Sequence, residues 1–127
     1  MWTYHSNTGV LEHNGTTIGR GYSGHAPNGV GVAPDGINNP ALESDPDVGP
    51  IPRGNYLIGQ FFDDPEKGLV VSRLAPAPGT NTFGRSGFMI HGDNVEGNES
   101  ASLGCIILPR PVRISIASMK DFDLEVV

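Results

Sequence analysis

Glycine and proline interrupt this chain so often that no long helix can form. The 127 residues contain 18 glycines and 11 prolines, about twice the share of an average protein. Apolar segments recur between these interruptions, so the chain still carries enough hydrophobic residues to bury one core. The length allows a single domain, which we place over residues 1–127. These features predict a compact, turn-rich domain that is mainly β.

Alternating apolar residues and turn signals predict where the strands lie. Three antiparallel strands are expected at residues 2–4, 10–13 and 16–22, with Asn14-Gly15 as a two-residue hairpin turn. Further strands are expected at residues 55–61, 69–74, 87–91, 105–108 and 122–127, and one helix at residues 112–119, with Pro111 at its start. The long Gly- and Pro-rich stretch at residues 23–52 is predicted to be a loop that lies over or beside a site.

Charge and hydropathy exclude several classes of protein. The net charge is −6 and the basic residues are scattered, which disfavours a nucleic-acid partner. No apolar run approaches the roughly 20 residues that span a bilayer, so membrane insertion is not expected. The first residues lack the basic and apolar regions of a signal peptide. We therefore expect a protein that does not export itself, or one domain of a longer chain.

Cys105 is the single cysteine, so it is either a core residue or a nucleophile. His91 ends one predicted strand and Cys105 begins another, and neighbouring strand ends can bring imidazole and thiol within about 3–4 Å. Gly104 lets the backbone approach a substrate, and the N–H of Cys105 with a neighbouring N–H can form an oxyanion hole. The three apolar residues after Cys105 favour the other reading, in which the thiol is simply buried.

Several motifs occur in the order of a known family. Residues 49–56 (Gly-Pro-Ile-Pro-Arg-Gly-Asn-Tyr) resemble the Pro-x-Gly-x-Tyr/Phe strand entry of the L,D-transpeptidases, Ile90-His91-Gly92 their Ile-His-Gly segment, and Ser102-Leu103-Gly104-Cys105 their Ser-His-Gly-Cys nucleophile motif. More closely, Gly21-Tyr22-Ser23-Gly24-His25, Asn38-Asn39-Pro40, Ile90-His91-Gly92-Asp93 and Ser102-x-Gly104-Cys105-Ile106 resemble small L,D-transpeptidase-related effectors delivered by bacterial type VI secretion. The resemblance runs over nearly the whole chain.

This resemblance implies a fold and a reaction. The fold is a single mainly-β, L,D-transpeptidase-like β-sandwich domain with about one short α-helix near the C-terminus. Cys105 attacks the L-centre carbonyl of meso-diaminopimelate in a peptidoglycan tetrapeptide stem, releases D-alanine and leaves a thioester. Water then completes an L,D-carboxypeptidase reaction, whereas an amine completes transpeptidation or D-amino-acid exchange. His91 is the base, the carbonyl of Gly92 holds its ring, and no metal or other cofactor is implied.

Further residues are candidates for contacts with the stem peptide. Tyr22, Ser23 and His25 are expected to line its groove, Asp93 to pair with the diaminopimelate ammonium or to position the His91 loop, Ser102 to anchor the cysteine loop, and Gly104 to approach the substrate. Arg53, Arg85 or Arg110 can bind a stem carboxylate. Ordinary turn and surface roles remain the alternative for each of these residues.

The chain also departs from the transpeptidase pattern. Leu103 stands where that motif has a second histidine, and Ile106 and Ile107 replace polar residues after the cysteine. The separation of His91 and Cys105 is shorter than in the housekeeping enzymes. Trimming and exchange are therefore expected more than cross-linking.

Two other classes of function stay open. One is a non-catalytic peptidoglycan-binding module with a buried Cys105. The other is a metal-dependent hydrolase that uses His25, His91 and Asp93, although a His-x-Asp pair with one distant histidine is a weak signal. For the effector-like reading we expect delivery by a secretion machine, action in the periplasm of a target bacterium, and a cognate immunity protein.

Overall fold

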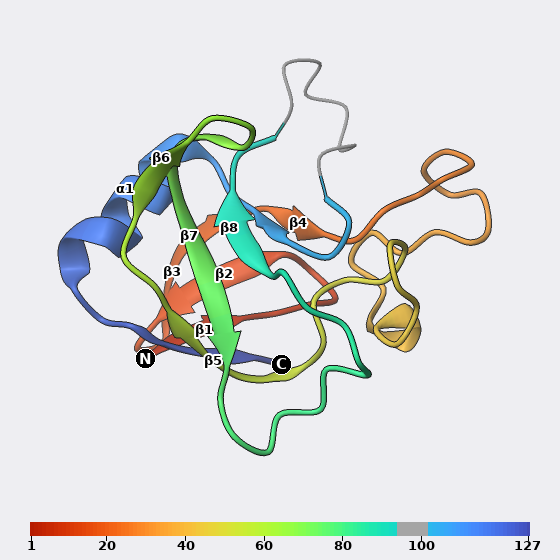
Figure 1. The fold of residues 1–127 in the computed structure, drawn as a ribbon, viewed down its shortest axis with the longest axis horizontal. Coiled ribbons are helices and arrows are strands. Elements are labelled where there is room, and N and C mark those ends of the chain that lie inside the picture. The colour runs from red at the N-terminus through yellow and green to blue at the C-terminus, as the bar shows by residue number, and fades with distance from the viewer. Residues whose placement is uncertain (94–101) are drawn as a thin grey trace.

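The computed structural model describes residues 1–93 and 102–127 of the chain. The described residues form ten strands, one α-helix and one short 3-10 helix (Figure 1). In chain order the elements are β1 (Trp2–Tyr4), β2 (Val10–His13), β3 (Thr16–Arg20), β4 (Tyr22–Ser23), η1 (Pro40–Leu42), β5 (Gly54–Ile58), β6 (Phe62–Asp64), β7 (Gly68–Pro76), β8 (Met89–His91), β9 (Ile106–Ile107), α1 (Arg110–Met119) and β10 (Asp123–Val126). The prediction of a mainly-β domain with one helix near the C-terminus is confirmed.

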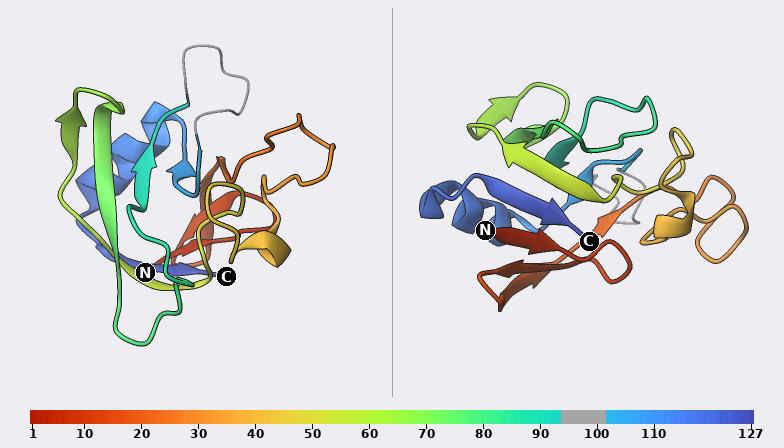
Figure 2. Two further views of the ribbon diagram at one scale, coloured as in Figure 1. Left: turned by 45° about the vertical axis from the view of Figure 1, so that its right-hand side comes forward. Right: turned by 90° about the horizontal axis from the view of Figure 1, so that it is seen from below.

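The strands connect edge to edge in the order β3-β2-β1-β10-β5-β7-β8-β9-β4, and β6 pairs with β7 off this path. Two of the pairings are parallel, β1 with β10 and β8 with β9. The long strand β7 joins the two halves of the path, because its last residues pair with β5 while Ser72 and Arg73 pair with β8. Helix α1 and the loop that runs from β4 to β5 lie at opposite ends of the molecule (Figure 2).

The first hairpin forms as local sequence chemistry predicts. Asn14 and Gly15 have φ angles of 48° and 86°, the left-handed pair that a two-residue hairpin turn requires. The strand predicted at residues 16–22 is divided in two, however, which corrects the prediction. A Cβ atom on Gly21 would lie 1.7 Å from the carbonyl oxygen of Ile107, so the chain passes that backbone closely at Gly21. It then leaves β2 and pairs with β9 as β4.

Strand β6 was not predicted, because Asp63-Asp64-Pro65 has the composition of a turn. In the structure Phe62 pairs with Val71 of β7, and the guanidinium of Arg73 lies 4.7 Å from the centre of the Phe62 ring. Cross-strand contacts of this kind stabilise a strand whose own sequence does not favour one.

Helix α1 holds one face toward the core. Val112 and Ile116, four residues apart, are buried, as expected for neighbouring positions on one helix face. The buried Arg113 donates hydrogen bonds to the carbonyls of Leu69, Val70 and Leu108. These bonds attach the helix to β7 and to the segment that follows β9.

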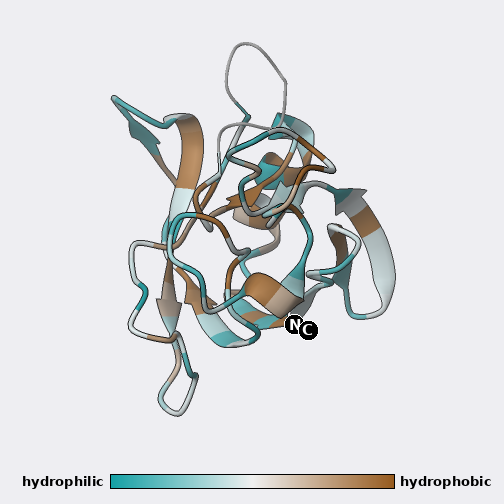
Figure 3. Ribbon diagram, turned by 90° about the vertical axis from the view of Figure 1, so that its right-hand side faces the viewer, coloured by the Kyte–Doolittle hydropathy of each residue, from teal (hydrophilic) through white to brown (hydrophobic). Residues whose placement is uncertain are grey.

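Hydrophobic residues from the strands and from α1 form the core. Along the strands, hydrophobic residues alternate with hydrophilic ones (Figure 3). The largest fully buried side chains are Trp2, Tyr4, Tyr56, Leu11, Ile51, Ile90, Ile106, Leu108, Ile116, Leu124, Val71 and Val126. Among the described residues, no helix has the length and apolar character needed to cross a membrane.

Candidate active site

The parallel pairing of β8 and β9 brings His91 and Cys105 to the same part of the fold. Ile90 pairs with Ile106 and His91 with Ile107, so Cys105, just before β9, falls two residues short of the level of His91. That offset is about 6.5 Å along the strands. His91 and Cys105 therefore lie on adjacent segments, but they are not directly opposite each other.

The ring of His91 is oriented by its neighbour in the chain. Nδ1 lies 2.8 Å from the carbonyl oxygen of Gly92, the contact that the resemblance implied. A carbonyl oxygen can only accept a hydrogen bond, so Nδ1 carries the proton and Nε2 has a free lone pair. Nε2 is buried and has no hydrogen-bond partner among the described residues. A buried acceptor without a partner is suited to receive a proton.

The thiol of Cys105 opens onto a cavity of about 380 Å³. The residues that line this cysteine cavity are Asp47, Lys67, Ser86, Gly87, Phe88, Met89, Leu103, Gly104 and Cys105. The side chain of Cys105 is half-buried, and its Sγ lies 3.8 Å from the carbonyl oxygen of Gly87. Asp47, which belongs to the loop at residues 23–52 that was expected to lie over or beside a site, is among these lining residues.

Burial keeps both groups in their neutral forms. Desolvation raises the pKa of the Cys105 thiol, against the lowering effects of the Met89 backbone N–H and of the charges on Lys67 and Arg85. Desolvation also lowers the pKa of His91, and its hydrogen bond to Gly92 only partly offsets this. At neutral pH the resting pair is therefore a thiol and a neutral imidazole rather than an ion pair.

The predicted contact between imidazole and thiol is absent from the structure. Nε2 of His91 has no partner in the described part of the chain, and the thiol is directed toward Gly87 instead. The reason is the offset of two residues between the neighbouring strand ends. Catalytic hydrogen bonds are often longer in a free enzyme than in its complex with substrate. A proton transfer between these two groups would require the thiol to turn toward the ring.

A buried hydroxyl shapes the turn that presents Cys105. Ser102 Oγ accepts hydrogen bonds from the backbone N–H groups of Gly24 and Gly104, both at 3.0 Å, and donates to the carbonyl of Cys105 at 2.7 Å. Gly104 has a φ of +125°, a conformation that favours glycine. The absence of a Cβ atom at Gly104 also leaves room for Arg85, because a Cβ atom there would lie only 2.5 Å from Nη2 of Arg85.

The other predicted substrate contacts fall into separate places. Ser23 is fully buried, and its hydroxyl accepts from the N–H of Ile51 and donates to the carbonyl of Gly104. The hydroxyl of Tyr22 donates to the carboxylate of Asp93 at 2.8 Å, and both line a second cavity of about 270 Å³ with Ile107. The Nδ1 of His25 is buried without a partner among the described residues. Of the six predicted contacts, Gly104 is the one that lines the cysteine cavity.

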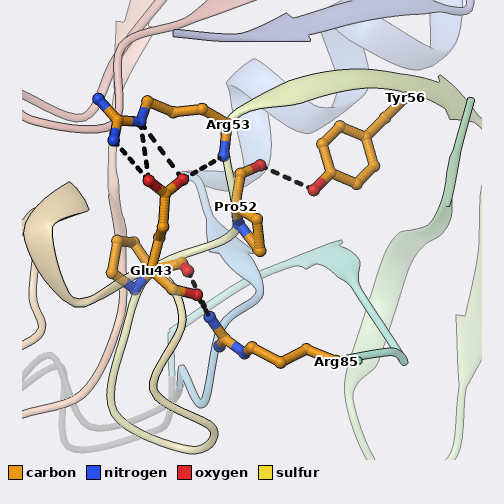
Figure 4. A network of polar contacts seen from close by, with 6 residues as sticks. Glu43, Pro52, Arg53, Tyr56 and Arg85 are labelled. Atoms are coloured by element: carbon orange, nitrogen blue, oxygen red, sulfur yellow. Dashed lines mark hydrogen bonds and ion pairs between the residues drawn. The ribbon is translucent and has the colours of Figure 1, made fainter. Parts of the chain in front are cut away.

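Two of the arginines considered for a carboxylate are engaged within the protein (Figure 4). Arg53 pairs with the carboxylate of Glu43. The buried Arg85 donates to the carbonyls of Glu43, Gly49, Pro50 and Leu103. Arg85 therefore joins the loop before β5 to the loop that carries the cysteine. Sequence reasoning missed this role, because carbonyl acceptors leave no signal in the sequence.

Sequence reasoning also missed Lys67 and Asp47, the charged residues of the cysteine cavity. Lys67 belongs to the turn between β6 and β7, and Asp47 to the loop before β5. The histidines and Asp93 considered for a metal do not gather, since no group of three or more potential ligands occurs in the described parts of the chain. The metal-hydrolase alternative therefore has no site among these residues.

Comparison with known proteins identifies one family. Residues 20–121, most of the chain, match the model of the Tlde1 domain. No curated protein matches the chain. The matched span includes His91, Cys105 and the residues of both cavities described above.

Proposed function

We propose, from the premise that this chain belongs to the Tlde1 domain family of type VI secretion effectors, that it is a cysteine-dependent L,D-carboxypeptidase and L,D-transpeptidase. Its substrate is the tetrapeptide stem of peptidoglycan, and its reactions are trimming and D-amino-acid exchange. The observation that carries the proposal is the placement of His91 and Cys105 on adjacent strand ends. The buried Nε2 of His91 has no hydrogen-bond partner among the described residues, and Cys105 lines a cavity.

The reaction begins with general-base activation of a neutral thiol. Nε2 of His91 takes the Sγ proton as Sγ forms a bond to the L-centre carbonyl carbon of diaminopimelate. The oxyanion that develops is met by the backbone N–H of Cys105 and a neighbouring N–H. When the C–N bond breaks, His91 returns the proton to the nitrogen of D-alanine, which leaves as the free amine. The enzyme retains a thioester.

The second half of the reaction sets the product. Water attacks the thioester carbonyl, gives a proton to His91 and releases a tripeptide stem, and the thiol regains its proton. A D-amino acid that attacks in place of water gives exchange. Leu103, where the transpeptidase motif has histidine, makes the cavity wall less polar, which favours these small acceptors over a second stem peptide.

The remaining predicted residues divide into two roles. Ser23, Ser102 and the carbonyl of Gly92 position the cysteine loop and the imidazole. Tyr22 and Asp93 form part of a binding surface at the second cavity, and Gly104 lets the substrate approach in the cysteine cavity. For His25 the proposal keeps a contact with the stem peptide, although His25 lines neither cavity. The family also favours delivery by a secretion machine into a target cell and a cognate immunity protein. The periplasm is the compartment in which this substrate occurs.

A non-catalytic peptidoglycan-binding module is the second candidate. Two observations favour it: burial raises the pKa of the thiol, and the imidazole and thiol are not hydrogen-bonded. Reactive cysteines usually have a lowered pKa.

The experiment that separates these candidates follows products by mass spectrometry. Wild-type protein, Cys105→Ala and the control variant His5→Gln are incubated with disaccharide-tetrapeptide, with and without free D-amino acids. Loss or exchange of the terminal D-alanine is expected with wild type and His5→Gln, and none with Cys105→Ala. Folded wild type that binds the muropeptide and leaves it intact would establish the binding module instead.

A further inference from the structure

We propose that Lys67 anchors the free carboxylate of the residue that follows the attacked bond, and so restricts the enzyme to the C-terminal residue of a stem. This inference rests on the proposed function and names the feature of the substrate that the site reads. Lys67 is the cation that lines the cysteine cavity, and Asp47 is the anion.

The turn that carries Lys67 is held in place while its side chain remains available. The carboxylate of Asp64 accepts the backbone N–H groups of Glu66 and Lys67, at 2.8 and 2.9 Å. The side chain of Lys67 is exposed and forms no ion pair with any described residue. An ammonium group on a fixed turn, without an internal partner, can bind an anion of the ligand.

Neighbouring cations are already engaged. The guanidinium of Arg85 donates to loop carbonyls, and that of Arg113 donates to the carbonyls around α1. Arg73 lies over the ring of Phe62. Lys67 is thus the cationic residue in the lining of the cysteine cavity, and its ammonium has no hydrogen-bond or ion-pair partner among the described residues.

The position of Lys67 relative to the reacting atoms is suitable. Its charge lowers the pKa of both Cys105 and His91, so its field reaches the thiol and the imidazole. In a stem that ends one residue after the attacked carbonyl, the terminal carboxylate is separated from that carbonyl by about 4 Å. Both groups fit a cavity of about 380 Å³.

Asp47 determines on which side of the cavity the terminal carboxylate of the substrate binds. Because Asp47 comes from a different element and carries the opposite charge, it repels a carboxylate and leaves the Lys67 side of the cavity as the favourable position. A peptide bond within a longer chain has no carboxylate at this point. The cavity therefore favours removal of a terminal residue over cleavage inside a peptide.

The first test compares two substrates that differ only at the C-terminus. Wild type should process the free-acid tetrapeptide with a kcat/KM about tenfold above that of its C-terminal carboxamide, the value of one hydrogen bond to a charged group. Lys67→Met should lose this preference by slowing the free acid alone, and Lys67→Arg should retain most of it. Lys120→Met is the matched control, because Lys120 lies outside the cysteine cavity. Equal rates on both substrates in wild type would overturn the inference and leave the proposed function intact.

The second test does not depend on turnover. Cys105 is the only cysteine, so alkylation of the protein by iodoacetate and by iodoacetamide reports on this cavity alone. In each reaction Sγ bonds to the methylene carbon and iodide leaves. Because both reagents react with the thiolate, the ratio of the two rates does not depend on the fraction of Cys105 that is ionised. Lys67→Met should lower the iodoacetate to iodoacetamide ratio about threefold, and Asp47→Asn should raise it.

These outcomes separate the two proposals. If neither tetrapeptide is processed, the proposed function fails, and the alkylation ratio still decides whether Lys67 attracts a carboxylate. An identical ratio in wild type and Lys67→Met would overturn the role of Lys67 whatever the substrates show.

Discussion

The imidazole of His91 is tied to the carbonyl oxygen of Gly92, the next residue, by a hydrogen bond of 2.8 Å from Nδ1. This bond sets the tautomer of a buried ring and leaves Nε2 as the acceptor. The same burial lowers the pKa of His91 and raises that of Cys105. In the proposed reaction the pair would therefore act as a general base and a neutral thiol, and the dependence of that reaction on pH follows from these two pKa shifts.

Activity should be flat across the neutral range. Because the pKa of His91 is lowered, Nε2 stays unprotonated as the pH falls below the ordinary histidine value of 6.5, and kcat/KM should begin to fall only at a lower pH. Because the pKa of Cys105 is raised, alkylation of the thiol by iodoacetamide should rise with a midpoint above that of a free cysteine. A pre-formed ion pair would instead give an alkylation midpoint below pH 7 that His91→Ala abolishes.

Replacement of Ser102 should cost both stability and activity. Ser102→Ala leaves the buried N–H groups of Gly24 and Gly104 without their acceptor, so unfolding in urea should show a loss of about 2–3 kcal/mol. The turn before Cys105 then loosens, and kcat should fall at least tenfold. Ser118→Ala is the control, since that exposed hydroxyl bonds only to a carbonyl of its own helix. An active and fully stable Ser102→Ala would contradict the positioning role.

Arg85 should prove structural, in contrast to an arginine that binds substrate. Arg85→Met removes the donors that hold the carbonyls of Gly49, Pro50 and Leu103, and we expect a loss of about 3 kcal/mol. The exposed Arg110→Met should change the free energy of unfolding by less than about 0.5 kcal/mol. Thermal unfolding of both variants checks this, and a stable Arg85→Met with a raised KM would assign Arg85 to the substrate instead.

Leu103→His probes the departure from the transpeptidase motif. Leu103 is 55% exposed and lines the cysteine cavity, so a histidine there can be accommodated without disturbing the core. It should raise the ratio of transpeptidation to hydrolysis severalfold, because a polar side chain in the wall can hold an acceptor amine. The measurement is the ratio of cross-linked to trimmed muropeptides. An unchanged ratio would show that the position does not govern the acceptor.

Local chemistry determined much of this fold from the sequence alone. The Asn14-Gly15 turn needs two left-handed residues in succession, which few other pairs supply. The helix follows from Val112 and Ile116 at a spacing of four residues and from the proline at its start. The candidate pair Cys105 and His91 was accessible in the same way, because a single cysteine and a histidine at a strand end stand out in the sequence.

The tertiary structure decided what surrounds that pair. The parallel pairing of β8 with β9 sets the two-residue offset between His91 and Cys105, and strand register depends on packing across distant segments. Lys67 lies at the cavity because strand β6 pairs with β7 and places the turn between them there. Local sequence preferences do not favour a strand at β6. Arg85 donates its hydrogen bonds to backbone carbonyls, and because every residue has such a carbonyl, the sequence does not indicate which ones it will contact. Contacts between distant segments therefore placed the charges around the thiol, whereas neighbours in the chain had already determined its turns and its helix.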